Sequence, residues 1–244
     1  MDIKLALLTG IDIPISELQL SIHQPTIKEI SYLGEEGFFI AVQYLCLNKQ
    51  AFIKDEKILQ ATTNFQLFLT VIQDESNLEI RKYLLDLLTI LFPGYKAIFT
   101  PQSIILNNLE TKHTVLIDES NFEILQYYIK TITCFYANVG GDYSNYNPAN
   151  KKAQEIAEKL MRGRQIAAAQ KGENNGSILG RYVSVLTVGL QSMSFQDCLN
   201  LTIYQLYDLI ERYSLYVNWD IDIRSRLAGA NPDSKPDDWM KNIH

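Results

Sequence analysis

The stretch Leu199–Ala230, LNLTIYQLYDLIERYSLYVNWDIDIRSRLAGA, carries a sustained helical pattern. Thr202 is the predicted N-cap, because its hydroxyl can accept a hydrogen bond from an amide of the first turn. The pattern resumes over Ile221–Leu227, and Gly229 followed by Pro232 predicts the end of the helix. Between these ends the residues at steps of three and four fall on one helix face: Ile203, Leu206, Tyr207, Ile210, Ser214 and Val217.

Large aromatic side chains are more frequent in this stretch than one buried stripe requires. The aliphatic series Ile203, Leu206, Ile210 and Val217 already fills such a stripe. Exposed aromatics would form a patch that soluble monomers rarely tolerate, so a neighbouring element, a C-terminal cap or a partner should cover them. Intramolecular packing is the alternative to a partner. The residues predicted to bind another protein are Tyr204, Tyr213, Tyr216, Trp219 and Trp239.

The first half of the chain mixes short strand patterns with helical ones. Asp2–Leu8 and Glu17–His23 are predicted to form a hairpin, and Thr26 with Glu29 has the capping-box spacing. The helices predicted after this cap falter at Gly34 and then cover Phe38–Leu47, Thr63–Gln73 and Asn77–Phe92. Short β-branched runs at Ala97–Thr100, Ser103–Leu106 and Thr114–Ile117 predict a small β-meander or hairpin. Asp118 or Ser120 is the predicted cap of the helix that follows.

These patterns predict a mainly α protein. An α+β N-terminal domain over 1–137, with its small β-meander or hairpin, precedes a linker over 138–150 and an all-helical domain over 151–244. The linker contains two glycines, four asparagines and a proline, which favour turns. The helix predicted over Lys151–Gln170 has a basic outer side. Another helix is predicted over Ser177–Leu190, and Ser194–Leu201 leads from it to the helix that follows Thr202.

Composition and motifs argue against several functions. The chain has 244 residues and a net charge of −6, which makes general nucleic-acid binding unlikely despite the basic helix. The patterns of nucleotide-binding loops, hydrolases and zinc proteases are missing, so we predict no enzyme activity, no cofactor and no metal. Three scattered cysteines indicate buried free thiols. The histidines His23, His113 and His244 are interpreted as surface or turn residues rather than ligands or bases.

The apolar runs are too short for a signal peptide or a bilayer span, which predicts no membrane association and a location in the cytoplasm. The segments SILGRY, LTIYQLYDLIERY and RLAGA…DDWMKNIH, within Ser177–Trp239, resemble proteins from the tail-assembly modules of Gram-positive bacteriophages. The resemblance extends back through NPANKKAQEIAEKLMRGR and IDESNFEILQYYIK. It implies a tail or baseplate assembly chaperone, or a minor morphogenesis factor.

Three functions are open at this point. The first is a non-enzymatic morphogenesis protein that binds a tail or baseplate component, or another copy of itself, during assembly. The second is a minor structural protein that stays in the virion. The third is a host-directed regulator or a small enzyme whose site is made of scattered polar residues.

Overall fold

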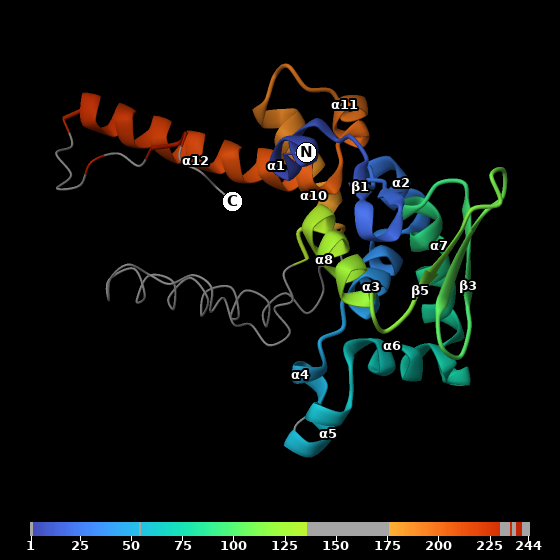
Figure 1. Cartoon of the computed structure of the whole chain (residues 1–244). Coiled ribbons are helices and arrows are strands. Elements are labelled where there is room, and N and C mark those ends of the chain that lie inside the picture. The colour runs from blue at the N-terminus through green and yellow to red at the C-terminus, as the bar shows by residue number, and fades with distance from the viewer. Residues whose placement is uncertain (1, 54, 136–175, 230–234, 236–237, 241–244) are drawn as a thin grey trace. The chain divides into compact units, whose positions relative to one another are not determined.

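The computed structural model describes residues 2–53, 55–135, 176–229, 235 and 238–240. Most of the described elements are helices, and two small antiparallel sheets lie in the N-terminal half (Figure 1). The predicted fold class is therefore confirmed, including the helical C-terminal part. One compact unit consists of Met1–Ala137 and Leu179–His244.

The N-terminal segment begins with a helix, so the predicted strand over Asp2–Leu8 is wrong. Helix α1 covers Ile3–Thr9, because the Asp2 side chain accepts hydrogen bonds from the amides of Lys4 and Leu5. Gly10, at φ 70°, ends the helix. The predicted hairpin exists further along, between β1 (Ile13–Ile15) and β2 (Leu20–Ile22), with Ser16–Leu18 as a short 3-10 helix between them.

A series of short helices follows the hairpin. Thr26 and Thr63 each cap a helix through a complete capping box, as the Thr26–Glu29 spacing predicts. The predicted break at Gly34 separates the first two helices. The bounds are α2 (Ile27–Leu33), α3 (Glu35–Leu45), α4 (Lys49–Phe52), α5 (Glu56–Ala61), α6 (Asn64–Gln73), a 3-10 turn (Glu75–Asn77) and α7 (Leu78–Leu91).

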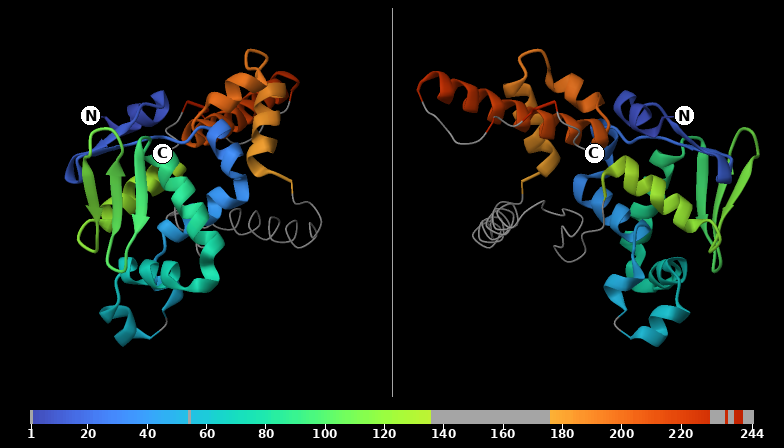
Figure 2. Two further views of the ribbon diagram at one scale, coloured as in Figure 1. Left: turned by 90° about the vertical axis from the view of Figure 1, so that its right-hand side faces the viewer. Right: turned by 60° about the vertical axis from the view of Figure 1, so that its left-hand side comes forward.

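The predicted meander is present as a three-stranded antiparallel sheet. Its strands are β3 (Tyr95–Phe99), β4 (Ile104–Asn108) and β5 (Thr114–Ile117), with β4 in the centre. Figure 2 shows the strands side by side with helices behind one face. Helix α8 (Phe122–Thr133) follows, and its predicted row Phe122, Leu125, Ile129 and Ile132 is fully buried.

The core of this part joins the helices to the sheet. The ring of Phe122 lies 5.0 Å from that of Phe65 and 5.1 Å from that of Phe68. Helices α3 and α7 approach closely at Gly37, where an added Cβ atom would lie 2.7 Å from the ring of Tyr83. The backbones of the two helices can therefore approach more closely at Gly37 than a side chain there would allow.

Three helices make up the described C-terminal part: α10 (Ile178–Gly189), α11 (Phe195–Asn200) and α12 (Ile203–Leu227). Thr202 caps α12 as predicted, and its hydroxyl accepts a hydrogen bond from the amide of Gln205 at 3.2 Å. The predicted linker over 138–150 and the basic helix over Lys151–Gln170 lie outside the described residues. The division into domains 1–137 and 151–244 therefore stays a prediction.

Candidate functional site

The first turns of α12 are anchored in the core. The side chains of Ile203 and Leu206 are fully buried, and Tyr204 is 4% exposed. The side chain of Gln205 donates a hydrogen bond to the carbonyl of Leu8, at 2.8 Å, which attaches α12 to the end of α1. Further contacts with α8 complete this anchored base, which we define as Ile203–Ile210.

The rest of α12, which we define as the distal half, Glu211–Leu227, is not covered in the same way. Every side chain in this range is half-buried or exposed, and Figure 1 shows the helix continuing beyond its neighbours. Three large apolar side chains are strongly exposed: Tyr216 at 44%, Ile221 at 59% and Leu227 at 84%. Val217, predicted to belong to the core, is only half-buried. The buried stripe of α12 is therefore shorter than the sequence predicts.

An aromatic cluster lies on the distal half. The ring centroid of Tyr216 lies 6.1 Å from that of Trp219 and 5.5 Å from that of Trp239, and the two indoles are 6.5 Å apart. Arg212 donates a hydrogen bond from Nη1 to the carbonyl of Trp239, at 2.8 Å. Trp239 therefore packs back on α12 and covers part of its aromatic surface, while Tyr216 stays accessible.

The five residues predicted to bind a partner occupy three environments. Tyr204 belongs to the buried core. Tyr213 packs against α10, where an added Cβ atom at Gly189 would lie 2.3 Å from its hydroxyl. Tyr216, Trp219 and Trp239 form the cluster. The structure thus brings three of the five together on one surface, and their role in binding a partner stays a prediction.

Charged residues flank the apolar side chains of the distal half. Asp220 and Arg224 form an ion pair at 2.9 Å, and Asp222 and Arg226 form one at 3.0 Å. Such exposed pairs within one helix add little stability, about 0.3–0.5 kcal/mol each. They surround Ile221 with charge of both signs. None of the described helices is long and apolar enough to cross a membrane.

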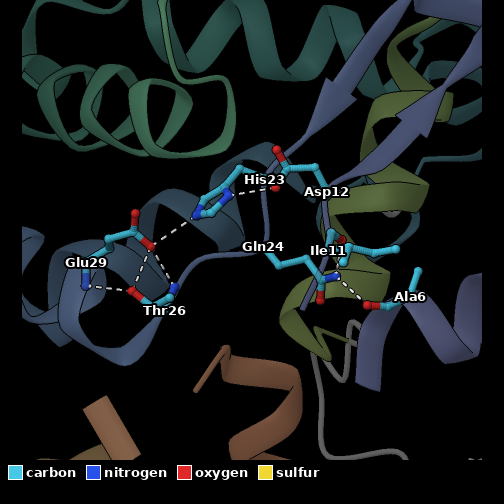
Figure 3. A network of polar contacts seen from close by, with 7 residues as sticks. All are labelled: Ala6, Ile11, Asp12, His23, Gln24, Thr26 and Glu29. Carbon is cyan, nitrogen blue, oxygen red and sulfur yellow. Dashed lines mark hydrogen bonds and ion pairs between the residues drawn. The ribbon is translucent and has the colours of Figure 1, made fainter. Parts of the chain in front are cut away.

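A second candidate site, which is polar and lies in the N-terminal part, was not predicted from the sequence. His23 is half-buried and contacts two carboxylates: Nδ1 lies 2.8 Å from Asp12 Oδ1, and Nε2 lies 3.2 Å from Glu29 Oε2 (Figure 3). Thr26 donates its hydroxyl to the same Glu29 oxygen at 2.7 Å. The interpretation of His23 as a surface or turn residue is therefore incomplete. Asp12 is 11 residues from His23, and no spacing rule links them.

Electrostatics in this polar site follow from the contacts. Burial alone would lower the pKa of His23, but the hydrogen bonds with Asp12 and Glu29 outweigh it, so that the pKa is raised above 6.5. Burial acts against ionisation of Glu29, but hydrogen bonds from Thr26 and His23 lower the pKa of this carboxyl. Both ring nitrogens of His23 and the Thr26 hydroxyl are occupied by these bonds. The arrangement therefore favours a structural role over proton transfer to a substrate.

The environments of the three cysteines likewise favour a structural role. All three are free, and Cys46 and Cys198 are buried as predicted, whereas Cys134 is half-buried. Burial raises the pKa of Cys46 and of Cys134 to about 12. Among the residues that the structure describes, no group of three or more histidine, cysteine, aspartate or glutamate side chains could hold a metal ion.

Fold and surface together define a mainly helical protein whose last described helix has a buried base and an exposed, partly aromatic distal half. Residues 171–244, which include α10, α11 and α12, match a family model described as the YomV second domain. YomV is a phage-encoded protein, so the match supports a phage protein. No curated protein and no solved structure matches the chain.

Proposed function

We propose that the chain is a non-enzymatic phage morphogenesis protein, which binds a tail or baseplate component during assembly through the distal half of α12. The observation that carries the proposal is the exposure of Tyr216, Ile221 and Leu227 on a helix whose base is fixed in the core. A helix held at one end presents these side chains without a large loss of conformational entropy on binding. The family match over the same helices supports a phage context.

The chemistry of the surface suits a protein partner. Aromatic side chains and arginine are frequent energetic centres of protein interfaces, and the cluster of Tyr216, Trp219 and Trp239 lies beside Arg212. The flanking ion pairs Asp220–Arg224 and Asp222–Arg226 would form a polar rim. As an assembly chaperone, the protein would shield an apolar surface of its partner until that surface meets its permanent neighbour.

Pairwise co-expression with each structural and assembly protein of the same phage module tests the proposal. The test variant Leu227→Ser changes a side chain that is 84% exposed in the distal half, and the control Val188→Ser changes one that is 82% exposed on α10. One module protein should co-purify with the wild type and with the control, and less with the test variant. Equal recovery with all three chains, or no partner in the module, would contradict the proposal.

Mass spectrometry of purified particles then separates an assembly chaperone from a minor structural protein. A chaperone leaves the particle when assembly is complete, so its peptides should be found with the assembly intermediates and not in mature virions. Stoichiometric peptides in mature virions would instead support the structural role, with the same binding surface.

A further inference from the structure

The segment His23–Thr26, with the sequence HQPT, links several elements that are distant in the chain. The amide of His23 donates to the carbonyl of Leu91, at 2.8 Å, at the end of α7. Thr26 caps α2 and forms an antiparallel bridge with Thr202 at the start of α12. The side chains of His23 and Gln24 hold the loop that follows α1 (Figure 3). This short segment therefore joins α1, α2, α7 and α12.

Two neighbouring side chains hold that loop. Gln24 is fully buried, and its Nε2 donates to the carbonyls of Ala6, at 2.9 Å, and Ile11, at 2.6 Å. His23 holds the next residue, Asp12, through Nδ1. We call the contacts of His23 and Gln24 with Ala6, Ile11 and Asp12 the clasp. The Oε1 atom of Gln24 has no hydrogen-bond partner among the described residues, so the clasp lacks one internal bond.

The contacts of His23 depend on its charge. A neutral imidazole has one N–H donor, whereas the protonated ring has two. Both ring nitrogens lie within hydrogen-bond distance of a carboxylate, which is an acceptor when ionised. Only the protonated ring can donate to Asp12 and Glu29 at once. Loss of the proton leaves one carboxylate facing a nitrogen lone pair.

The clasp is connected to the base of α12 through α1. The carbonyl of Leu8, in the last turn of α1, accepts the hydrogen bond from Gln205. Gly10 also lies against the start of α12, since an added Cβ atom at Gly10 would be 3.2 Å from Gln205 and 3.3 Å from Thr202. Release of the loop at Ile11 and Asp12 would therefore loosen a contact that fixes α12.

We propose that His23 is a pH-sensitive switch: when protonated it closes the clasp and holds α1 against the base of α12, and when neutral it loosens both. The switch acts on this attachment whether or not a partner binds the distal half. Asp12, a carboxylate partner of His23, is exposed and lines a surface hollow of about 500 Å³ with Pro14, Gln19 and Tyr95. Solvent therefore reaches the site.

The charges around His23 support this direction. Asp12 comes from the loop after α1 and Glu29 from α2, and both raise the pKa of His23. Helix α7 contributes the Leu91 carbonyl, and its Asp86 shares a second hollow with Glu29. Since the folded pKa is above the ordinary value of 6.5, the extra stability is present below that value and is lost as the pH rises through the folded pKa.

Hydrogen exchange of the full chain at about pH 6 and about pH 9, corrected for intrinsic rates, tests the switch. Protection of Ile3–Thr9 and of the first turn of α12 should fall by about twofold to fivefold at the higher pH, the change expected for one partly exposed charge-assisted hydrogen bond. His23→Gln should show the lower protection at both pH values. The control His113→Gln, which removes a ring bonded to Tyr95 instead, should respond like the wild type.

Protection of α1 that does not change with pH in the wild type, or that changes equally in His23→Gln, would overturn the switch. If His23→Gln does not fold, an NMR titration of His23 in the wild type and in Asp12→Asn replaces it. Removal of the Asp12 charge should lower the measured pKa of His23, and an unchanged pKa would overturn the proposal. These readouts need no partner, so their failure is separate from failure of the proposed binding function.

Discussion

Thr26 and Thr202 face each other in an antiparallel bridge, and each is the N-cap of its own helix. The amide of Ile27 donates to the carbonyl of Leu201 at 2.9 Å, and the amide of Ile203 donates to the carbonyl of Pro25 at 3.0 Å. The first amides of a helix have no partner within it. Here the starts of α2 and α12 supply acceptors to each other, which connects the C-terminal helix to the N-terminal part.

Loss of either cap should destabilise the whole compact unit. Thr202→Ala removes the acceptor for the Gln205 amide and should lower the free energy of unfolding by roughly 1 kcal/mol. Thr26→Ala should cost more, because the Thr26 hydroxyl also donates to the Glu29 oxygen that contacts His23. Urea denaturation measures both. A smaller loss for Thr26→Ala than for Thr202→Ala would contradict this ranking.

Gly189 should not tolerate a side chain, because α10 and Tyr213 of α12 meet there. The Cβ atom of Gly189→Ala would lie 2.3 Å from the Tyr213 ring, and overpacking of this kind typically costs about 1–3 kcal/mol. The control Gly176→Ala has no atom within 4 Å of the new Cβ and should be nearly neutral. Thermal unfolding compares them. The additional change Tyr213→Leu should recover part of the loss, and a lack of recovery would place the cause elsewhere.

Stability should depend on pH through His23 and Glu29. The pKa of Glu29 is lowered from 4.5, so its contribution is present above that value and is lost as the pH falls through the lower folded pKa. The pKa of His23 is raised from 6.5, so its contribution is lost on the alkaline side. The free energy of unfolding, measured over a pH series, should include the contributions of both Glu29 and His23 between about pH 4.5 and pH 6.5. Each contribution should be at most about 1 kcal/mol, since the carboxylates of Asp12 and Glu29 are partly exposed.

The variant His23→Gln should remove the alkaline decrease in stability and leave the acidic one in a weaker form. Unfolding curves of this variant and of the wild type, recorded over the same pH series, provide the comparison. A decrease above neutral pH that persists in His23→Gln would show that another group causes it.

The thiols of Cys46 and Cys134 should react slowly in the folded protein. Their pKa values of about 12 leave almost no thiolate at neutral pH, and the thiolate is the reactive form. Alkylation followed by mass spectrometry should label both only after denaturant is added. Rapid labelling of Cys46 under native conditions would contradict its burial.

Local sequence rules predicted much of the fold. Thr26 with Glu29 and the buried row of α8 were identified because a cap and a helical period need only neighbouring residues. The strand predicted over Asp2–Leu8 was wrong because a short apolar run suits a strand or a helix equally. The Asp2 cap and the positive φ of Gly10 decide for the helix.

The sites were less predictable, because they depend on contacts between distant residues. The contact of His23 with Asp12 and the burial of Tyr204 both result from tertiary packing. Periodicity placed Val217 and Leu206 on one stripe, but it does not report where the neighbouring elements end. The distal half of α12 is exposed because the helix continues beyond them.

The division of α12 into an anchored base and an exposed distal half is tested most directly by two variants measured for both stability and binding. Leu206→Ala, at a fully buried site, should cost roughly 2–5 kcal/mol of stability. Leu227→Ser should leave stability within about 0.5 kcal/mol of the wild type. It should nevertheless weaken binding of the module partner identified by co-expression by at least about 1 kcal/mol, measured by calorimetry. Unchanged affinity for Leu227→Ser, or a stability loss as large as that of Leu206→Ala, would contradict the account.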